Sequence, residues 1–286
     1  ADVGKSHDIS VQRYLLDYRM QLAAQKSGVD CKKLKVLSLT KPSELNGYWT
    51  ISCLDENGEE EEYFSRIVVA ADGPKSLLSR SVGLINSNTN VLWSRSFAKP
   101  GTHIFKADFA IFHPSEISPG FFVISKEVED YLSLCCYNMS NSLNESELED
   151  LHHKLITQNP QITKALGNDV EFTSINCAPM RIGGIWKCYF DQYLVVGSAA
   201  GHVDPLNGQG IQYAIIGGKL AARTILEGVS KGDLSSVILQ KYQRRINNAF
   251  AYDLWMSGLL AKILYYLPSI LDATAAMIKR NGEGPL

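Results

Sequence analysis

Four glycines stand in a loop between two strongly apolar segments. They are Gly197, Gly201, Gly208 and Gly210. Residues 193–196, before the loop, predict a buried strand, and residues 211–227 predict a long helix. Glycines let the backbone come close to a ligand, and the free amide groups and positive dipole end of a helix attract negative charge. The loop is therefore a candidate binding site for an anion, or for a group that becomes anionic during a reaction.

The same loop carries His202 and Asp204, two side chains that can transfer protons. Either residue could deliver a proton to a reacting centre beside the loop after a hydride transfer. A structural role fits them as well, because His202 could fill space and Asp204 could cap the following turn. The residues alone leave both interpretations open.

A second glycine turn follows another continuously apolar run. Residues 66–71 predict a strand that is buried on both faces, and the strand stops abruptly at Asp72 and Gly73. Nearer the start of the chain, residues 9–27 predict a helix that carries Arg13 and Asp17. The planar fork of an arginine suits phosphate oxygens, and a surface position suits Arg13 nearly as well.

These segments together resemble the FAD-dependent oxidoreductases that share the para-hydroxybenzoate hydroxylase fold. The stretch GSAAGHVDPLNGQGI resembles the second flavin-binding motif of that family, and residues 68–80 resemble its Asp-Gly motif. The resemblance implies that the Pro-x-x-Gly-x-Gly-Ile part of the loop lies against the flavin ring. A reduced flavin gains negative charge at its N1 edge, which suits a helix amino terminus. The implied FAD-binding residues are Arg13, Asp72, Gly73, Gly197, Ser198, Gly201, Pro205, Gly208, Gly210 and Ile211.

Spacing indicates one branch of that family. Arg80 comes eight positions after Asp72, as in geranylgeranyl reductases, whereas aromatic hydroxylases more usually have seven. Residues 178–181 and the glycine loop also resemble those reductases. The implied activity is the reduction of carbon–carbon double bonds in an isoprenoid or lipid-like substrate by reduced FAD. The alternative is a monooxygenase that uses reduced nicotinamide, NAD(P)H, and oxygen.

The chain departs from the family pattern at three places. Ser198 stands where the family has an aspartate, and the aromatic substrate motif of archaeal reductases is not evident, with residues 120–124 in its place. No GxGxxG loop follows a strand near the amino terminus, so we expect half a Rossmann sheet and half a cofactor site. Such a chain would be a fragment, a truncated gene model or a splice form. A non-catalytic remnant with a binding role is therefore the alternative to an enzyme.

The predicted fold is α/β with an α+β substrate sheet. A partial Rossmann-like FAD-binding domain is expected to interleave with an antiparallel-sheet substrate domain and a helical carboxyl-terminal region. The expected domains are residues 1–85 and 181–228 for the FAD-binding parts, 86–180 for the substrate domain and 229–286 for the helices. Strands are predicted over residues 34–39, 47–54 and 60–64, and a single helix over residues 145–165.

Composition and residue patterns bear on three kinds of partner: nucleic acid, metal ions and membranes. The 28 basic and 30 acidic residues leave a net charge of −2, which argues against nucleic acid. The six cysteines show no CxxC pair, so no metal site is predicted, and Cys135 with Cys136 fits a buried strand. Residues 254–271 are apolar but are interrupted by Lys262 and Pro268, which favours helices packed on the core over membrane docking. The expected location is the cytoplasm or a membrane surface, with peripheral contact through these helices.

Overall fold

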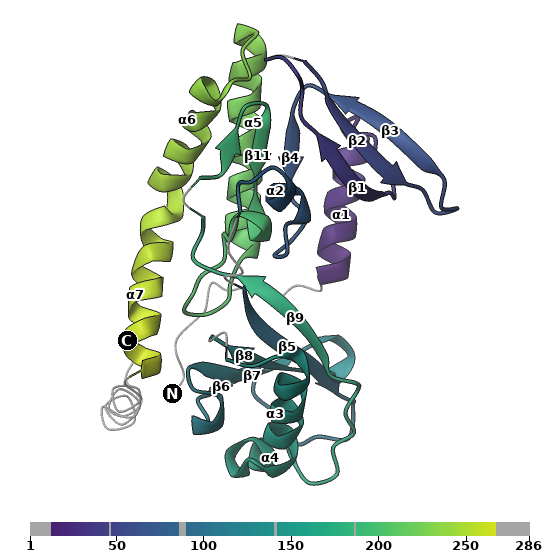
Figure 1. Ribbon diagram of the computed structural model, residues 1–286. Coiled ribbons are helices and arrows are strands. Elements are labelled where there is room, and N and C mark those ends of the chain that lie inside the picture. The colour runs from purple at the N-terminus through teal and green to yellow at the C-terminus, as the bar shows by residue number, and fades with distance from the viewer. Residues whose placement is uncertain (1–12, 46, 86–89, 140–141, 186, 267–286) are drawn as a thin grey trace.

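A three-stranded sheet forms the centre of one half of the molecule in the computed structural model, which describes residues 13–45, 47–85, 90–139, 142–185 and 187–266 (Figure 1). β4 (Val68–Ala70) pairs in parallel with β11 (Tyr193–Val195), and β10 (Tyr189–Phe190) pairs antiparallel with β11. Every residue of β11 is fully buried, as its continuous apolar sequence predicts. Ala70 lies opposite Val195, so the segments that follow both strands leave from the same edge of the sheet.

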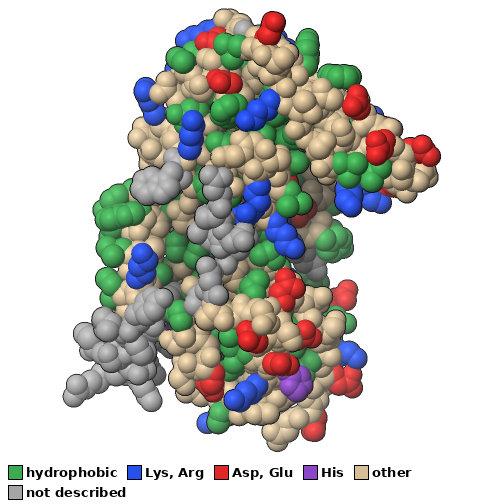
Figure 2. Space-filling view, viewed as in Figure 1, with side chains coloured by type: hydrophobic (Ala, Val, Ile, Leu, Met, Phe, Trp, Pro, Cys, Tyr) green, Lys and Arg blue, Asp and Glu red, His purple; other side chains and the backbone are tan. Residues whose placement is uncertain are grey.

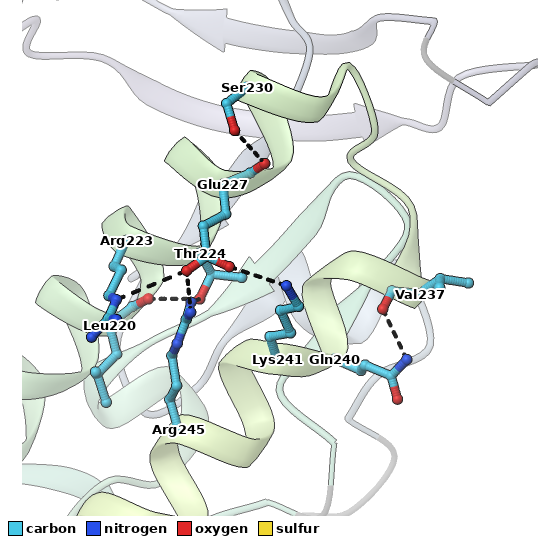
Figure 3. A network of polar contacts seen from close by, with 9 residues as sticks. All are labelled: Leu220, Arg223, Thr224, Glu227, Ser230, Val237, Gln240, Lys241 and Arg245. Atoms are coloured by element: carbon cyan, nitrogen blue, oxygen red, sulfur yellow. Dashed lines mark hydrogen bonds and ion pairs between the residues drawn. The ribbon is translucent and has the colours of Figure 1, made fainter.

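Two helices pack together beside this sheet. α5 (Ile211–Lys231) and α6 (Ser236–Ile246) are joined by a polar network around Glu227, which Figure 3 shows from close by. Glu227 accepts hydrogen bonds from Lys241 at 3.2 Å and from Arg245, and Arg245 also donates to the hydroxyl of the buried Thr224 at 2.7 Å. Tyr242 of α6 donates to the backbone oxygen of Val195 at 3.1 Å, which fixes α6 against the sheet.

A meander and a separate helix complete this half. β1 (Lys35–Thr40), β2 (Trp49–Leu54) and β3 (Glu60–Ser65) pair antiparallel in that order, which confirms the three predicted strands. The predicted first helix is confirmed as α1 (Arg13–Lys26), while residues 9–12 lie outside the described residues. α1 has no buried residue. Its side chains Leu15, Leu16 and Leu22 are half-buried, so the helix lies on the surface of this half.

The other half is built on five antiparallel strands. Their order is β6-β7-β8-β5-β9. Helices α3 (Glu145–Gln158) and α4 (Pro160–Leu166) pack on one face through buried side chains such as Phe122, Leu148 and Leu155. This sheet and the parallel strand pair confirm the predicted α/β fold with an antiparallel substrate-side sheet. The strands are β5 (Asn90–Ala98), β6 (Phe109–Phe112), β7 (Gly120–Lys126), β8 (Leu132–Asn138) and β9 (Asn176–Arg181).

The prediction of one helix over residues 145–165 is wrong. α3 (Glu145–Gln158) ends at Asn159, and α4 (Pro160–Leu166) starts directly after it. The side chain of Asn159 accepts hydrogen bonds from the amides of Gln161 and Ile162, and a proline at the first helical position has no amide that needs a partner. The Asn-Pro pair therefore ends one helix and begins the next.

A long bent helix runs along one side of the molecule from the parallel strands to the five-stranded sheet (Figure 1). α6 continues through a π-turn (Asn247–Ala251) into α7 (Tyr252–Tyr266). Residues 267–286 of the predicted helical region lie outside the described residues. In the part of the chain that the structure describes, no helix combines the length and the apolar character that a membrane span requires.

Candidate functional site

The glycine loop begins at the end of β11 and leads into the amino terminus of α5. A short 3₁₀ turn (Gly197–Ala200) follows the strand, and Gly210 is the cap residue before α5. Gly210 offers no side-chain acceptor to the first amide groups of the helix, and its helix is 21 residues long. The first amide groups of α5 therefore have no side-chain cap, and the helix dipole gives this end of the helix a partial positive charge.

The Asp-Gly turn lies next to this loop because their two strands are neighbours. Val196 donates to the backbone oxygen of Ala70 at 3.0 Å, so the chain beyond β11 runs beside the chain beyond β4. Asp72 follows β4, and its carboxylate accepts hydrogen bonds from the Ser76 hydroxyl and the Leu78 amide, each at 3.0 Å. The carboxylate therefore holds the start of the short helix α2 (Leu77–Ser81). Gly73 sits at the turn beside it.

Asp204 holds the glycine loop in shape. Its carboxylate accepts hydrogen bonds from the amides of Leu206 at 2.7 Å and Asn207 at 3.3 Å, and from the Ser257 hydroxyl at 2.8 Å. The side chain is buried, and both of its oxygens are bonded within the protein. This geometry favours the structural interpretation of Asp204 over a role as a proton donor.

His202 points into the protein core. Its ring lies 5.0 Å from the ring of Phe250 in an edge contact, and its Nε2 lies 3.8 Å from the Sγ of Cys188. Burial lowers the pKa of His202 to about 4, so the imidazole is neutral near pH 7. Its Nδ1 has no hydrogen-bond partner among the described residues. Packing therefore favours the space-filling interpretation of His202.

Arg13 pairs with a neighbour in its own helix. It forms an ion pair with Asp17 at 3.1 Å within α1, and both side chains are more than half exposed. The sequence places this arginine near phosphate through resemblance alone. Among the described residues, the Arg13 guanidinium donates hydrogen bonds to the Asp17 carboxylate, so the pair links residues of one helix.

Arg181 is a site residue that the sequence reasoning missed. It ends β9, is fully buried, and donates from Nε to the backbone oxygen of Pro74 at 3.1 Å. Its side chain also lies so near Gly201 that a Cβ there would come within 3.1 Å of the arginine Cγ. Burial, with a smaller effect of the Arg80 charge, lowers the pKa of the Arg181 guanidinium. The residue joins the substrate-side sheet to both turns. Its sequence signal was its place in residues 178–181, the segment that resembles the reductases, but no site role was predicted for it.

An aromatic surface lies under the loop. Tyr137 stacks on Phe121 at 4.7 Å and on Trp93 at 6.0 Å between ring centroids. Gly208 has φ +73°, and a Cβ there would come within 3.2 Å of the Tyr137 ring, so the loop touches this surface. Ala261 of α7 packs on the same cluster. Phe121, from the segment that stands in place of the family's aromatic substrate motif, faces this side of the sheet, whereas Phe122 faces the α3 core.

The residues around the glycine loop are chemically suited to a flavin, although Ser198 replaces the aspartate that the family resemblance implies. The uncapped start of α5 and the glycine backbone match a ring that becomes anionic. Ser198 supplies a half-buried hydroxyl where a carboxylate would bind a sugar hydroxyl more strongly. Among the described residues, no group of three His, Cys, Asp or Glu side chains is arranged to bind a metal ion.

Comparison with known proteins gives one family match and several relatives. Residues 16–251 match the family model described as "FAD binding domain". The chain is 35% identical over 278 residues to "Conditioned medium factor receptor 1" of Dictyostelium discoideum, a match that covers 96% of this chain and 54% of that protein. It is 26% identical over 238 residues to "Digeranylgeranylglycerophospholipid reductase 1" of Methanothermobacter thermautotrophicus, covering 82% and 58%. The chain therefore spans little more than half the length of both relatives.

Two solved structures share the fold. A geranylgeranyl bacteriochlorophyll reductase-like protein from Thermoplasma acidophilum superposes with a TM-score of 0.76 at 21% identity, covering 91% of this chain and 67% of that one. A p-nitrophenol 4-monooxygenase from Pseudomonas putida superposes with a TM-score of 0.68 at 14% identity, covering 96% and 68%. At such identities the likeness shows the fold alone.

Proposed function

Because this chain belongs to the FAD-binding domain family, we propose that it is part of an FAD-dependent oxidoreductase that reduces carbon–carbon double bonds in an isoprenoid or lipid-like substrate. One observation carries the proposal. The parallel pair β4 and β11 brings the Asp-Gly turn and the glycine loop to one sheet edge, and Gly208 of the loop lies against the Tyr137 ring, which stacks on Phe121.

FAD would be held from two sides in this arrangement. The backbone of Gly208 and Gly210 and the start of α5 would contact the ring, while the hydroxyl of Ser198 would face a sugar or ribityl hydroxyl. The Asp72-Gly73 turn and Arg13 would lie toward the phosphates, as the family resemblance implies. When bound, FAD would supply the hydride, and NAD(P)H is the proposed electron donor.

The rest of the cofactor site would come from outside the described residues. β4 is an edge strand, with Val69 exposed between two buried neighbours, and α1 has no buried residue. A further parallel strand beside β4 would bury Val69. The described residues therefore supply part of the cofactor site in this proposal.

The substrate would lie beside the aromatic surface under the loop, where Trp93 and Tyr137 are only half-buried. The side chains there are apolar, and α7 covers part of them through Ala261. Such a lining excludes water from the reacting carbons and suits an isoprenoid chain. The reductase names of the archaeal relatives agree with this substrate class.

Two other functions remain as proposals. A monooxygenase is favoured by the fold that the chain shares with the p-nitrophenol enzyme. A binding role without catalysis is favoured by Ser198 and by the receptor name of the Dictyostelium relative.

One assay separates the three functions. The FAD-loaded protein is mixed with reduced nicotinamide and a geranylgeranyl lipid, and hydrogenated lipid and oxygen uptake are measured together. Lipid reduction without oxygen uptake supports the reductase. Oxygen uptake coupled to nicotinamide oxidation supports the monooxygenase, and a protein that never holds FAD supports the binding role.

A further inference from the structure

α7 has apolar side chains on two opposite faces. Leu254 and Ala261 are buried on the inner face. The outer face carries six apolar side chains that are 39% to 67% exposed, and their three- and four-residue spacing places them in one stripe. The outer stripe of α7 consists of Tyr252, Trp255, Met256, Leu259, Leu260 and Ile263.

The inner contacts hold α7 in place, so the outer stripe is a fixed feature of the folded chain. Ser257 donates to the buried carboxylate of Asp204, and Ala261 packs with Phe121. Figure 2 shows hydrophobic side chains along the edge of the molecule where Figure 1 places α7. A helix that is apolar on both faces needs a second apolar neighbour besides the protein core.

The composition of the outer stripe matches a lipid interface. Tyr252 and Trp255 form an aromatic pair with centroids 6.0 Å apart, followed by aliphatic side chains along the helix. Tyrosine and tryptophan favour the boundary between water and hydrocarbon because each has an apolar ring and a polar tip. The exposed charges Asp253 and Lys262 cancel, so burial of apolar area would dominate binding.

The size of the stripe argues against a second copy of the chain as the occupant. Fifteen residues of helix give a face roughly 22 Å long and about 10 Å wide. A stable protein dimer buries about 800 Å² on each partner, more than this single helix face offers. Binding to a bilayer does not require this much buried area, because an interfacial helix binds through its own apolar face.

We propose that the outer stripe of α7 docks this protein on a lipid bilayer surface, with the helix lying in the plane of the interface. The inner face of the same helix packs on the aromatic surface under the glycine loop. Docking would therefore bring that surface beside the membrane. This last consequence rests on the proposed lipid-like substrate, whereas docking itself does not.

Flotation with phosphatidylcholine vesicles tests the proposal on the full chain. The wild-type protein is expected to float with vesicles at low and high salt, because the stripe has no net charge. The emission of Trp255 should shift to the blue, and Trp255→Phe should remove that shift but still float. The double variant Leu259→Ser with Ile263→Ser should weaken partitioning by at least about tenfold. The double variant Leu226→Ser with Val229→Ser changes exposed side chains of α5 and should bind as the wild type.

Three results would overturn the proposal. They are no flotation of the wild-type chain, equal loss in the α5 control, and binding only to vesicles that contain phosphatidylglycerol and only at low salt. A concentration-dependent doubling of mass that the α7 double variant abolishes, without flotation, would identify a second copy as the occupant. Vesicle binding needs no FAD, so these results are independent of the proposed enzyme activity.

Discussion

The Ser257 hydroxyl donates a hydrogen bond to the Asp204 carboxylate at 2.8 Å and so ties α7 to the glycine loop. The same carboxylate accepts the amides of Leu206 and Asn207, which form the turn inside the loop. One side chain therefore sets both the shape of the loop and the position of the helix that covers the aromatic surface. Asp204 is a positioning residue in this account.

Ser257→Ala is expected to lower the free energy of unfolding by about 1–3 kcal/mol, because it leaves a buried carboxylate oxygen without its donor. Urea denaturation would measure the change. Ser230→Ala is the matched control, since that hydroxyl donates to the backbone oxygen of Glu227 at an exposed position. A Ser257 variant as stable as the Ser230 variant would contradict the positioning role.

The protein should lose stability as the pH falls from about 6.5 toward 4. Burial lowers the pKa values of His152 and His202 to about 4. The unfolded chain, with ordinary histidine pKa values near 6.5, then binds more protons than the folded chain over this range. The stability is fully present above about pH 6.5, and each histidine should account for a loss on the order of 2 kcal/mol by pH 5.

Denaturation curves at pH 7 and pH 5 check that loss. His152 accepts or donates with the hydroxyls of Ser94 and Ser96 at 2.8 and 2.9 Å, and His152→Gln keeps polar groups there without titrating. The difference in stability between pH 7 and pH 5 should shrink in this variant. An unchanged difference would show that His152 does not cause the pH dependence.

Gly208→Ala should weaken FAD binding about tenfold in a form of the protein that binds FAD. The residue has φ +73°, and the new methyl group would press on the Tyr137 ring. Gly232→Ala introduces a similar strain, at φ +67°, with no neighbour within 4 Å. Isothermal titration should find normal FAD affinity in the Gly232 variant, and equal affinities in the two variants would exclude a specific role for the loop.

Ser198→Asp should raise FAD affinity by about tenfold, since a carboxylate accepts hydrogen bonds from sugar hydroxyls more strongly than a neutral hydroxyl does. Ser198 lies at the start of the short turn after β11, where the family resemblance places an aspartate. Ser198→Asn, which lacks the charge, is the control. If both substitutions leave the dissociation constant unchanged, this position does not contact the cofactor.

Local patterns predicted the elements around the site. The apolar runs before Asp72 and Gly197 are strands, and their parallel pairing brings the two turns together. The break between α3 and α4 could also be predicted, because the pair Asn159-Pro160 is a helix-start signal. The prediction of a single helix did not use this signal. These features depend on residues that are adjacent in the sequence, so local patterns are enough to predict them.

Contacts across the fold could not be predicted in the same way. The sequence left two roles open for His202, and only the position of Phe250 shows that its ring points inward. Arg181 meets Pro74 across 107 positions of the chain, and no periodicity reports such a contact. The apolar outer stripe of α7 was visible as hydrophobic residues, but only the contacts of the inner face show which side is exposed.

The most direct measurement is a visible absorption titration with FAD. It should be made on the 286-residue chain and, in parallel, on the Gly208→Ala variant. The account predicts the band shift of bound flavin in the chain and a weaker affinity in the variant, because Gly208 lies in the loop that would contact the ring. Free-flavin spectra throughout both titrations would contradict the flavoprotein account and leave the binding role in its place.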